Sequence, residues 1–106
     1  MRITVPTARV LAALLTDPDA DRYGLDLMQD TGLASGTLYP ILHRLVTAGW
    51  LATRWEEIDP VAQGRPARRY YRLTPEGVTR AGQALAELRA STAVAPEPRR
   101  TARPAW

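Results

Sequence analysis

A segment in the first half of the chain, residues 31–45, constrains the fold most strongly, because it has the pattern of a tight turn followed by an amphipathic helix. Gly32 lies in the predicted turn, and Ser35 stands where a helix N-cap accepts a hydrogen bond from a free backbone N–H group. Apolar residues then recur at the spacing of one buried helical face. They are Leu38, Ile41, Leu42 and Leu45. The segment therefore predicts a turn and a helix that packs on a hydrophobic core.

The outward face of this predicted helix is polar but carries no carboxylate. It offers hydroxyl groups, an aromatic ring, an imidazole and a guanidinium, which suit a helix that lies against phosphates and base edges. Its residues are Thr37, Tyr39, Pro40, His43 and Arg44. Pro40 is expected to bend the first turn, because its ring removes the hydrogen bond to the Gly36 carbonyl, and such departures are more frequent at functional sites. The alternative is an amphipathic helix whose polar face contacts only water.

The composition indicates one small domain with an anionic partner. The chain has 106 residues, of which 45% are hydrophobic, enough for a single core. Its 14 basic residues are all arginine and outnumber the 11 acidic residues, which weakly favours nucleic acid as the partner. The basic excess lies in residues 51–73. The absence of cysteine excludes disulfides and thiolate metal sites, and without an apolar run of membrane-spanning length we expect a cytoplasmic protein with no membrane partner.

A first helix is predicted close to the N-terminus. A threonine, Thr4 or Thr7, stands beside Pro6 as a helix start signal. An apolar stripe follows, and the helix is expected to stop near Asp17 and Pro18. The stripe consists of Val10, Leu11, Leu14 and Leu15.

A second helix is predicted over residues 22–31, with Asp21 as its N-cap and Gly32 as its left-handed stop. The aspartates of residues 17–21 have the spacing of a calcium loop, but the glycine and glutamate that such a loop requires are missing. No metal site is therefore predicted there. The helix is expected to bury Leu25, Leu27 or Met28.

Two short runs rich in aromatic and β-branched residues, 50–57 and 69–73, predict a β-hairpin. Residues 58–68 form its long tip, which contains aspartate, proline and glycine as turn formers. Arg65, Arg68 and Arg69 stand on the descending side of this tip. Such a tip could simply keep the protein soluble, but beside a turn and helix it resembles a wing that contacts phosphates or the minor groove.

A last helix begins at Thr74, with proline at the first helical position and an acid in the first turn. Its apolar residues alternate at spacings of three and four, a stripe that is too short to be stable alone. The first helix of the same chain could cover this stripe, but we expect a second copy of the protein, because a small fold has little surface for two apolar stripes. From Pro96 onward no periodicity remains, and residues 96–106 are predicted to be a disordered tail. The stripe consists of Val78, Ala81, Leu85, Leu88, Thr92 and Ala95.

The predicted order is helix, helix, turn, helix, hairpin, helix, which is a mainly α fold with a small β-hairpin. This is a winged helix-turn-helix over residues 1–74 followed by a dimerisation helix over residues 75–95. The chain resembles the short subfamily of PadR-type transcriptional regulators over roughly residues 3–90. The resemblance rests on Tyr23-Gly24-Leu25-Asp26-Leu27, on residues 35–45, and on Gly64-Arg65-Pro66 with the run from Arg68 to Gly77.

This resemblance implies a homodimer that binds an inverted repeat in a promoter, usually as a repressor that a small molecule releases. Some relatives bind flat aromatic compounds between tryptophans of the last helices, but residues 78–95 of this chain contain no aromatic side chain. The family does not identify the effector. The residues that the resemblance places on DNA are Ser35, Thr37, Tyr39, Pro40 and His43 in the third helix, and Arg65 and Arg68 in the wing.

Two other classes of function are alternatives to a DNA-binding regulator. An enzyme is not expected, because His43 is the only histidine, cysteine is absent, and no phosphate-binding loop or nucleophile elbow occurs. No cofactor is predicted for the same reasons. The stronger alternative is a winged helix that contacts only other proteins, which would bind DNA weakly and without a specific component.

Overall fold

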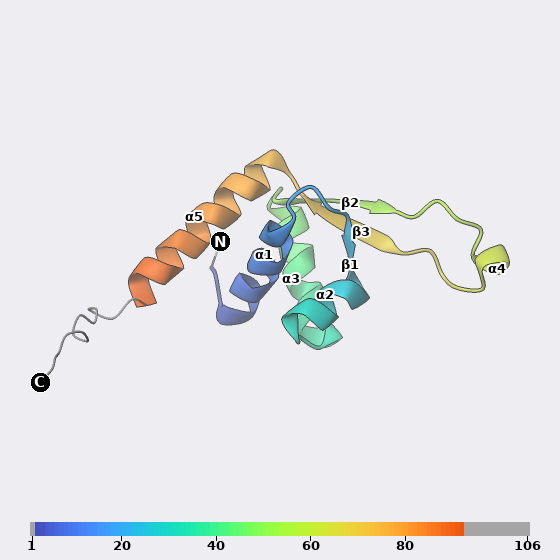
Figure 1. The fold of residues 1–106 in the computed structure, drawn as a ribbon, viewed down its shortest axis with the longest axis horizontal. Coiled ribbons are helices and arrows are strands. Elements are labelled where there is room, and N and C mark those ends of the chain that lie inside the picture. The colour runs from blue at the N-terminus through green and yellow to red at the C-terminus, as the bar shows by residue number, and fades with distance from the viewer. Residues whose placement is uncertain (1, 93–106) are drawn as a thin grey trace, which may run out of the picture.

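Helices and a small antiparallel sheet enclose the core in the computed structural model, which describes residues 2–92 (Figure 1). Within these residues the strand order is β1-β3-β2. The helices are α1 (Val5–Thr16), α2 (Gly24–Thr31), α3 (Ser35–Thr47), α4 (Pro60–Gln63) and α5 (Pro75–Thr92), and the strands are β1 (Arg22–Tyr23), β2 (Leu51–Trp55) and β3 (Arg69–Leu73). The predicted fold class is confirmed, whereas β1 and α4 were not predicted.

The core lies between the first three helices and one face of the sheet. Each of its leucines removes an apolar side chain from water, which contributes about 1.5–3 kcal/mol. The predicted buried face of α3 is confirmed, and that of α1 is confirmed except that Leu15 is only partly buried. In α2 the buried leucine is Leu27, since Leu25 is 54% exposed. The largest fully buried side chains are Val10, Leu11, Leu14, Leu27, Leu38, Leu42 and Leu45.

The predicted start of α3 was wrong by one residue. Ala34 is the N-cap and makes no side-chain hydrogen bond, so Ser35 is already the first helical residue. Pro40 lies inside this helix, which is continuous to Thr47. In α1, by contrast, the Oγ1 atom of Thr4 accepts a hydrogen bond from the Thr7 N–H, as expected of an N-cap.

The predicted N-cap of α2, Asp21, was also wrong. Residues 22–23 form β1, which pairs with β3, and the helix begins only at Gly24. The carboxylate of Asp21 accepts hydrogen bonds from Arg54 at 2.7 Å and from Arg72 at 3.1 Å. It is therefore engaged with the sheet, and these bonds, led by that of Arg54, hold the pKa of Asp21 below its ordinary value.

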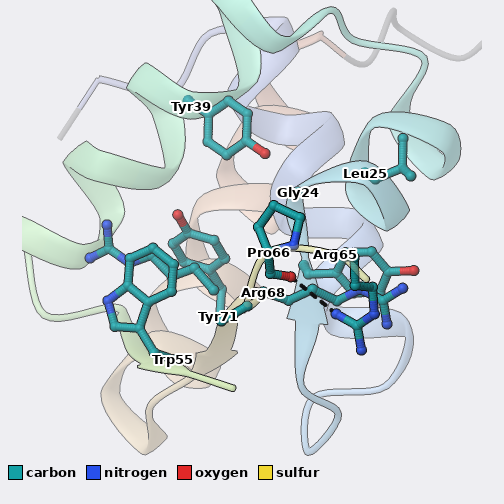
Figure 2. A pocket seen from close by; sticks show the side chains of 11 residues that line it. Gly24, Leu25, Tyr39, Trp55, Arg65, Pro66, Arg68 and Tyr71 are labelled. Carbon is teal, nitrogen blue, oxygen red and sulfur yellow. Dashed lines mark hydrogen bonds between the residues drawn. The ribbon is translucent and has the colours of Figure 1, made fainter. Parts of the chain in front are cut away.

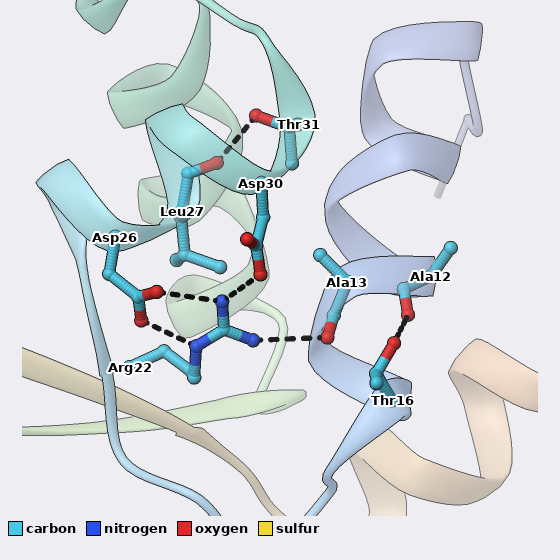
Figure 3. A network of polar contacts seen from close by, with 8 residues as sticks. All are labelled: Ala12, Ala13, Thr16, Arg22, Asp26, Leu27, Asp30 and Thr31. Atoms are coloured by element: carbon cyan, nitrogen blue, oxygen red, sulfur yellow. Dashed lines mark hydrogen bonds and ion pairs between the residues drawn. The ribbon is translucent and has the colours of Figure 1, made fainter.

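A nearly buried arginine joins the first three elements (Figure 3). The Arg22 side chain is 11% exposed, and its guanidinium donates hydrogen bonds to the carboxylates of Asp26 and Asp30 and, at 3.2 Å, to the Ala13 carbonyl. The hydrogen bond from Arg22 lowers the pKa of Asp26. Because a buried charge is tolerated only with such partners, this network determines where β1 and α2 sit against α1.

The last helix lies beside α1, on the side of the core away from the hairpin (Figure 1). Thr74 caps it as predicted, since the Gly77 N–H donates to the Thr74 Oγ1 atom at 2.9 Å. Ala81 is fully buried within its own chain, so α1 already covers part of the predicted stripe. Ala95 and the predicted tail, residues 96–106, lie outside the described residues. In residues 2–92 no helix has both the length and the apolar character that a membrane crossing requires.

Replacing either of two glycines of α5 by alanine is expected to change the free energy of unfolding in opposite directions. A Cβ atom at Gly77 would lie 1.9 Å from the backbone oxygen of Trp50, whereas nothing lies within 4 Å of one at Gly82. We expect Gly77→Ala to lower the free energy of unfolding by about 1–3 kcal/mol through overpacking. Gly82→Ala should raise it by about 0.5–1 kcal/mol through the higher helix propensity of alanine. Urea unfolding followed by circular dichroism tests this, and equal stability of the two variants would contradict the contact between α5 and Trp50.

Candidate nucleic-acid interface

The outward face of α3 is exposed along the whole helix. The apolar face of the same helix is buried, so the predicted division of the two faces is confirmed. The exposed residues include hydrogen-bond donors and acceptors but no carboxylate, which favours contact with a polyanion. They are Ser35, Thr37, Tyr39, Pro40, His43 and Arg44.

Tyr39 holds a special position on this face because its hydroxyl lies over the start of α2 (Figure 2). A Cβ atom at Gly24 would lie 1.8 Å from the Tyr39 Oη atom, so only glycine leaves room for the ring. The group that approaches Gly24 so closely is thus a side chain of α3 and not another backbone. Tyr39 remains 44% exposed and lies at the boundary between α3 and the hairpin.

The hairpin projects from the helices and carries α4 at its tip (Figure 1). We call β2, the tip and β3, residues 51–73, the wing. Where the tip joins the strands, the Arg65 guanidinium donates two hydrogen bonds to the Glu56 carboxylate, at 2.7 and 3.0 Å. Glu56 also accepts a hydrogen bond from the backbone N–H of Arg68 at 3.2 Å. Arg65, predicted to contact DNA, is therefore neutralised within the wing and closes its tip.

Two other wing arginines make no ion pair with a carboxylate within residues 2–92. The Arg68 guanidinium carbon lies 4.4 Å from the centre of the Tyr23 ring. Arg69 lies between the rings of Trp55 and Tyr71, 5.8 and 5.6 Å from their centres. Arg68 was predicted as a site residue. Arg69 was not, although alternation along β3 places it on the same face as Tyr71.

A family comparison covers most of this fold. The model of the "Transcriptional regulator PadR-like family" matches residues 10–84, which span α3 and the wing. The chain belongs to the PadR family. Its members are transcriptional regulators and not enzymes, so the PadR protein described here is a DNA-binding regulator. Comparison with curated proteins gives no match.

Solved structures of PadR-type proteins share the fold. A PadR-like transcription factor from Bacteroides fragilis is 27% identical, with a TM-score of 0.66 over 80% of this chain and 81% of that one. A Streptococcus mutans protein is 30% identical, with a TM-score of 0.66 over 86% and 84% of the two chains. A PadR family regulator from Eggerthella lenta is 26% identical, with a TM-score of 0.63 over 82% and 78%.

The Glu56 carboxylate should control the wing tip as a function of pH. The Arg65 hydrogen bond is the main cause that lowers the pKa of Glu56 from 4.5 to about 2. Because this pKa is lowered in the folded protein, the ionised Glu56 stabilises the wing tip fully above pH 4.5. This stabilisation is lost as the pH falls toward 2 and the carboxylate takes up a proton. We expect the exchange protection of the Arg68 backbone amide to fall in this window.

Nuclear magnetic resonance titration of the Glu56 carboxyl carbon measures this pKa directly. In the Arg65→Gln variant the pKa of Glu56 should move back toward 4.5, because the charged donor is gone. A wild-type Glu56 that already titrates near 4.5 would show that Arg65 is free in solution.

Proposed function

We propose that this PadR protein is a cytoplasmic transcriptional repressor that binds a palindromic operator as a homodimer and that a small molecule releases it. The observation that carries the proposal is the outward face of α3, which is exposed along the helix, rich in hydrogen-bonding groups and free of carboxylates. A helix of this kind fits the major groove, where base edges present distinct patterns of donors and acceptors. We call α3 the recognition helix.

Side chains of different chemistry are proposed to have different roles. Hydrogen-bonding side chains such as Thr37 and His43 read base edges, and Arg68 contributes charge toward phosphates. Arg65 acts mainly by holding the tip through Glu56. The full proposed DNA-contacting set is Ser35, Thr37, Tyr39, Pro40 and His43 with Arg65 and Arg68.

A second copy is proposed to pack on α5. Ala81 is buried by its own chain and Leu85 packs partly against its core, which leaves Val78 and the accessible parts of Leu85 and Leu88 for a partner. Leu85 and Leu88 line an open apolar groove with Val5, which is 64% exposed. Contiguous apolar surface of this kind is typical of an interface between subunits.

The recognition helix and the wing should respond differently to alanine substitution. After the operator has been selected from fragments of the host genome, His43→Ala should cost about 1–3 kcal/mol on the operator and much less on scrambled DNA. Arg68→Ala should weaken binding to both duplexes and reduce the salt slope by about one. Arg80→Ala is the matched control, because Arg80 is exposed on α5 and pairs with Glu76.

Titrations on both duplexes at several salt concentrations measure these effects. If wild-type protein binds the two duplexes equally, the specific function fails and the winged helix is a protein-contact module. If Arg68→Ala weakens operator binding alone, the charge role assigned to the wing is wrong.

Dimerisation through α5 is tested by introducing charged side chains into the proposed interface between the two copies. The double substitution Leu85→Glu and Leu88→Glu should yield monomers, because unpaired carboxylates would have to be buried. Gln83→Glu with Ala90→Glu adds the same charge at exposed positions of the same helix and should leave the dimer intact. Sedimentation equilibrium at micromolar concentration decides, and a monomeric wild type would contradict the proposal.

A further inference from the structure

A pocket of about 530 Å³ lies between the recognition helix and the wing. Tyr39 and the start of α2 form one wall, and Trp55 and Tyr71 of the wing form another (Figure 2). None of its lining residues comes from α5. It is therefore separate from the last helices, where some relatives bind aromatic compounds.

The Tyr71 hydroxyl is an unpaired polar group in this pocket. Tyr71 is only 5% exposed, and within residues 2–92 its hydroxyl makes no hydrogen bond to the protein. Figure 2 shows the hydroxyl end of the ring turned toward Tyr39. Burial raises the pKa of Tyr71, so at neutral pH the hydroxyl keeps its proton and can donate. Buried polar groups without a protein partner are rare and generally bind water or a ligand.

Positive charge lies beside the Tyr71 ring. The Arg69 guanidinium carbon is 5.6 Å from the centre of this ring, and its Nε atom donates to the Thr53 hydroxyl at 2.8 Å. Arg69 makes no ion pair with a carboxylate in residues 2–92. Arg68 lines the same pocket over the ring of Tyr23. By contrast, the charge of Arg65 is neutralised by Glu56. The pocket thus combines aromatic walls, a buried hydroxyl donor from Tyr71 and two cations that lack an acidic partner within residues 2–92.

We propose that this pocket binds a flat aromatic anion, with its rings beside Tyr39 and Trp55 and its negative group on the Tyr71 hydroxyl and Arg69. Aromatic walls favour stacked or edge-on rings, and a guanidinium with a hydroxyl binds an anionic oxygen. The volume lies within the range of about 300–1,000 Å³ that is typical of small-molecule sites, which favours fused rings over a single ring. This chemistry is shared by a fused-ring aromatic acid and by a purine nucleotide.

Occupation of this pocket would change DNA binding, a consequence that rests on the proposed function. Tyr39 belongs both to the pocket and to the outward face of the recognition helix. Arg68 belongs both to the pocket and to the proposed phosphate contact. A ligand held by both elements would compete with DNA for them, and it would therefore act as the releasing effector.

Binding is tested first without DNA. The probes are 2-naphthoate and guanosine monophosphate, with 2-naphthamide and guanosine as their uncharged counterparts. Calorimetry should show saturable binding of at least one anion and binding about tenfold weaker or more for its uncharged counterpart. Which anion binds tells an aromatic acid from a nucleotide.

Variants locate the bound anion. Tyr71→Phe keeps the ring in the core and removes only the hydroxyl, so it should weaken binding about tenfold. Tyr70→Phe is the matched control, because the Tyr70 hydroxyl lies 3.4 Å from Glu56 and does not line the pocket. Trp55→Leu removes an exposed wall and should also weaken binding. Saturable binding by neither anion, or binding that neither Tyr71→Phe nor Trp55→Leu weakens, would overturn the proposal.

The regulatory consequence is tested on the selected operator. A saturating anion should weaken DNA binding by the wild type and by Tyr70→Phe, and the same concentration should have a smaller effect on Tyr71→Phe. If the anion binds but leaves operator affinity unchanged, its role as effector is overturned. If the wild type binds the anion in the pocket but no DNA fragment, the proposed function fails while the pocket assignment is supported.

Discussion

The pairing register of β2 with β3 determines which side chains of the wing face the helices. Trp55 pairs with Arg69, so successive residues of one face run from Leu73 in the core, through Tyr71, to Arg69 beyond it. Because side chains alternate along a strand, a shift of one residue in β3 would turn Arg72 inward and Leu73 outward. The cost of burying an unpaired guanidinium excludes that arrangement. This one register therefore places Leu73 in the core, Tyr71 in the wall of the pocket and Arg69 at the edge of the pocket.

The fold was predictable where local chemistry decides it and not where distant residues decide it. Leucine spacing identified α1 and α3, and Thr74 with Pro75 marked the start of α5. Asp21 has the chemistry of an N-cap, but its partners Arg54 and Arg72 are 33 and 51 residues away in the chain. Pairing of β1 with β3 likewise depends on contacts that no local pattern contains.

In the candidate site, too, the part that depends on local sequence was predictable and the part that depends on distant contacts was not. Helical periodicity alone identified the outward face of α3, because burial of one face leaves the other in water. The wing arginines could not be ranked from sequence, since Arg65 meets Glu56 only when the hairpin closes. Net charge is a poor guide for the same reason. Several arginines of this chain neutralise carboxylates within the fold, among them Arg22, Arg54, Arg65 and Arg72.

The close approach of Tyr39 to Gly24 links the first residue of one helix to the exposed face of the next. Any side chain at position 24 occupies the space of the Tyr39 hydroxyl, so a larger residue there is compatible only with a smaller or reoriented one at position 39. The restriction falls on position 24, because glycine there leaves room for Tyr39, whereas a larger residue requires the Tyr39 ring to shift. A substitution at position 24 would therefore change what α3 presents at Tyr39, although residue 24 makes no contact with DNA in the proposed complex.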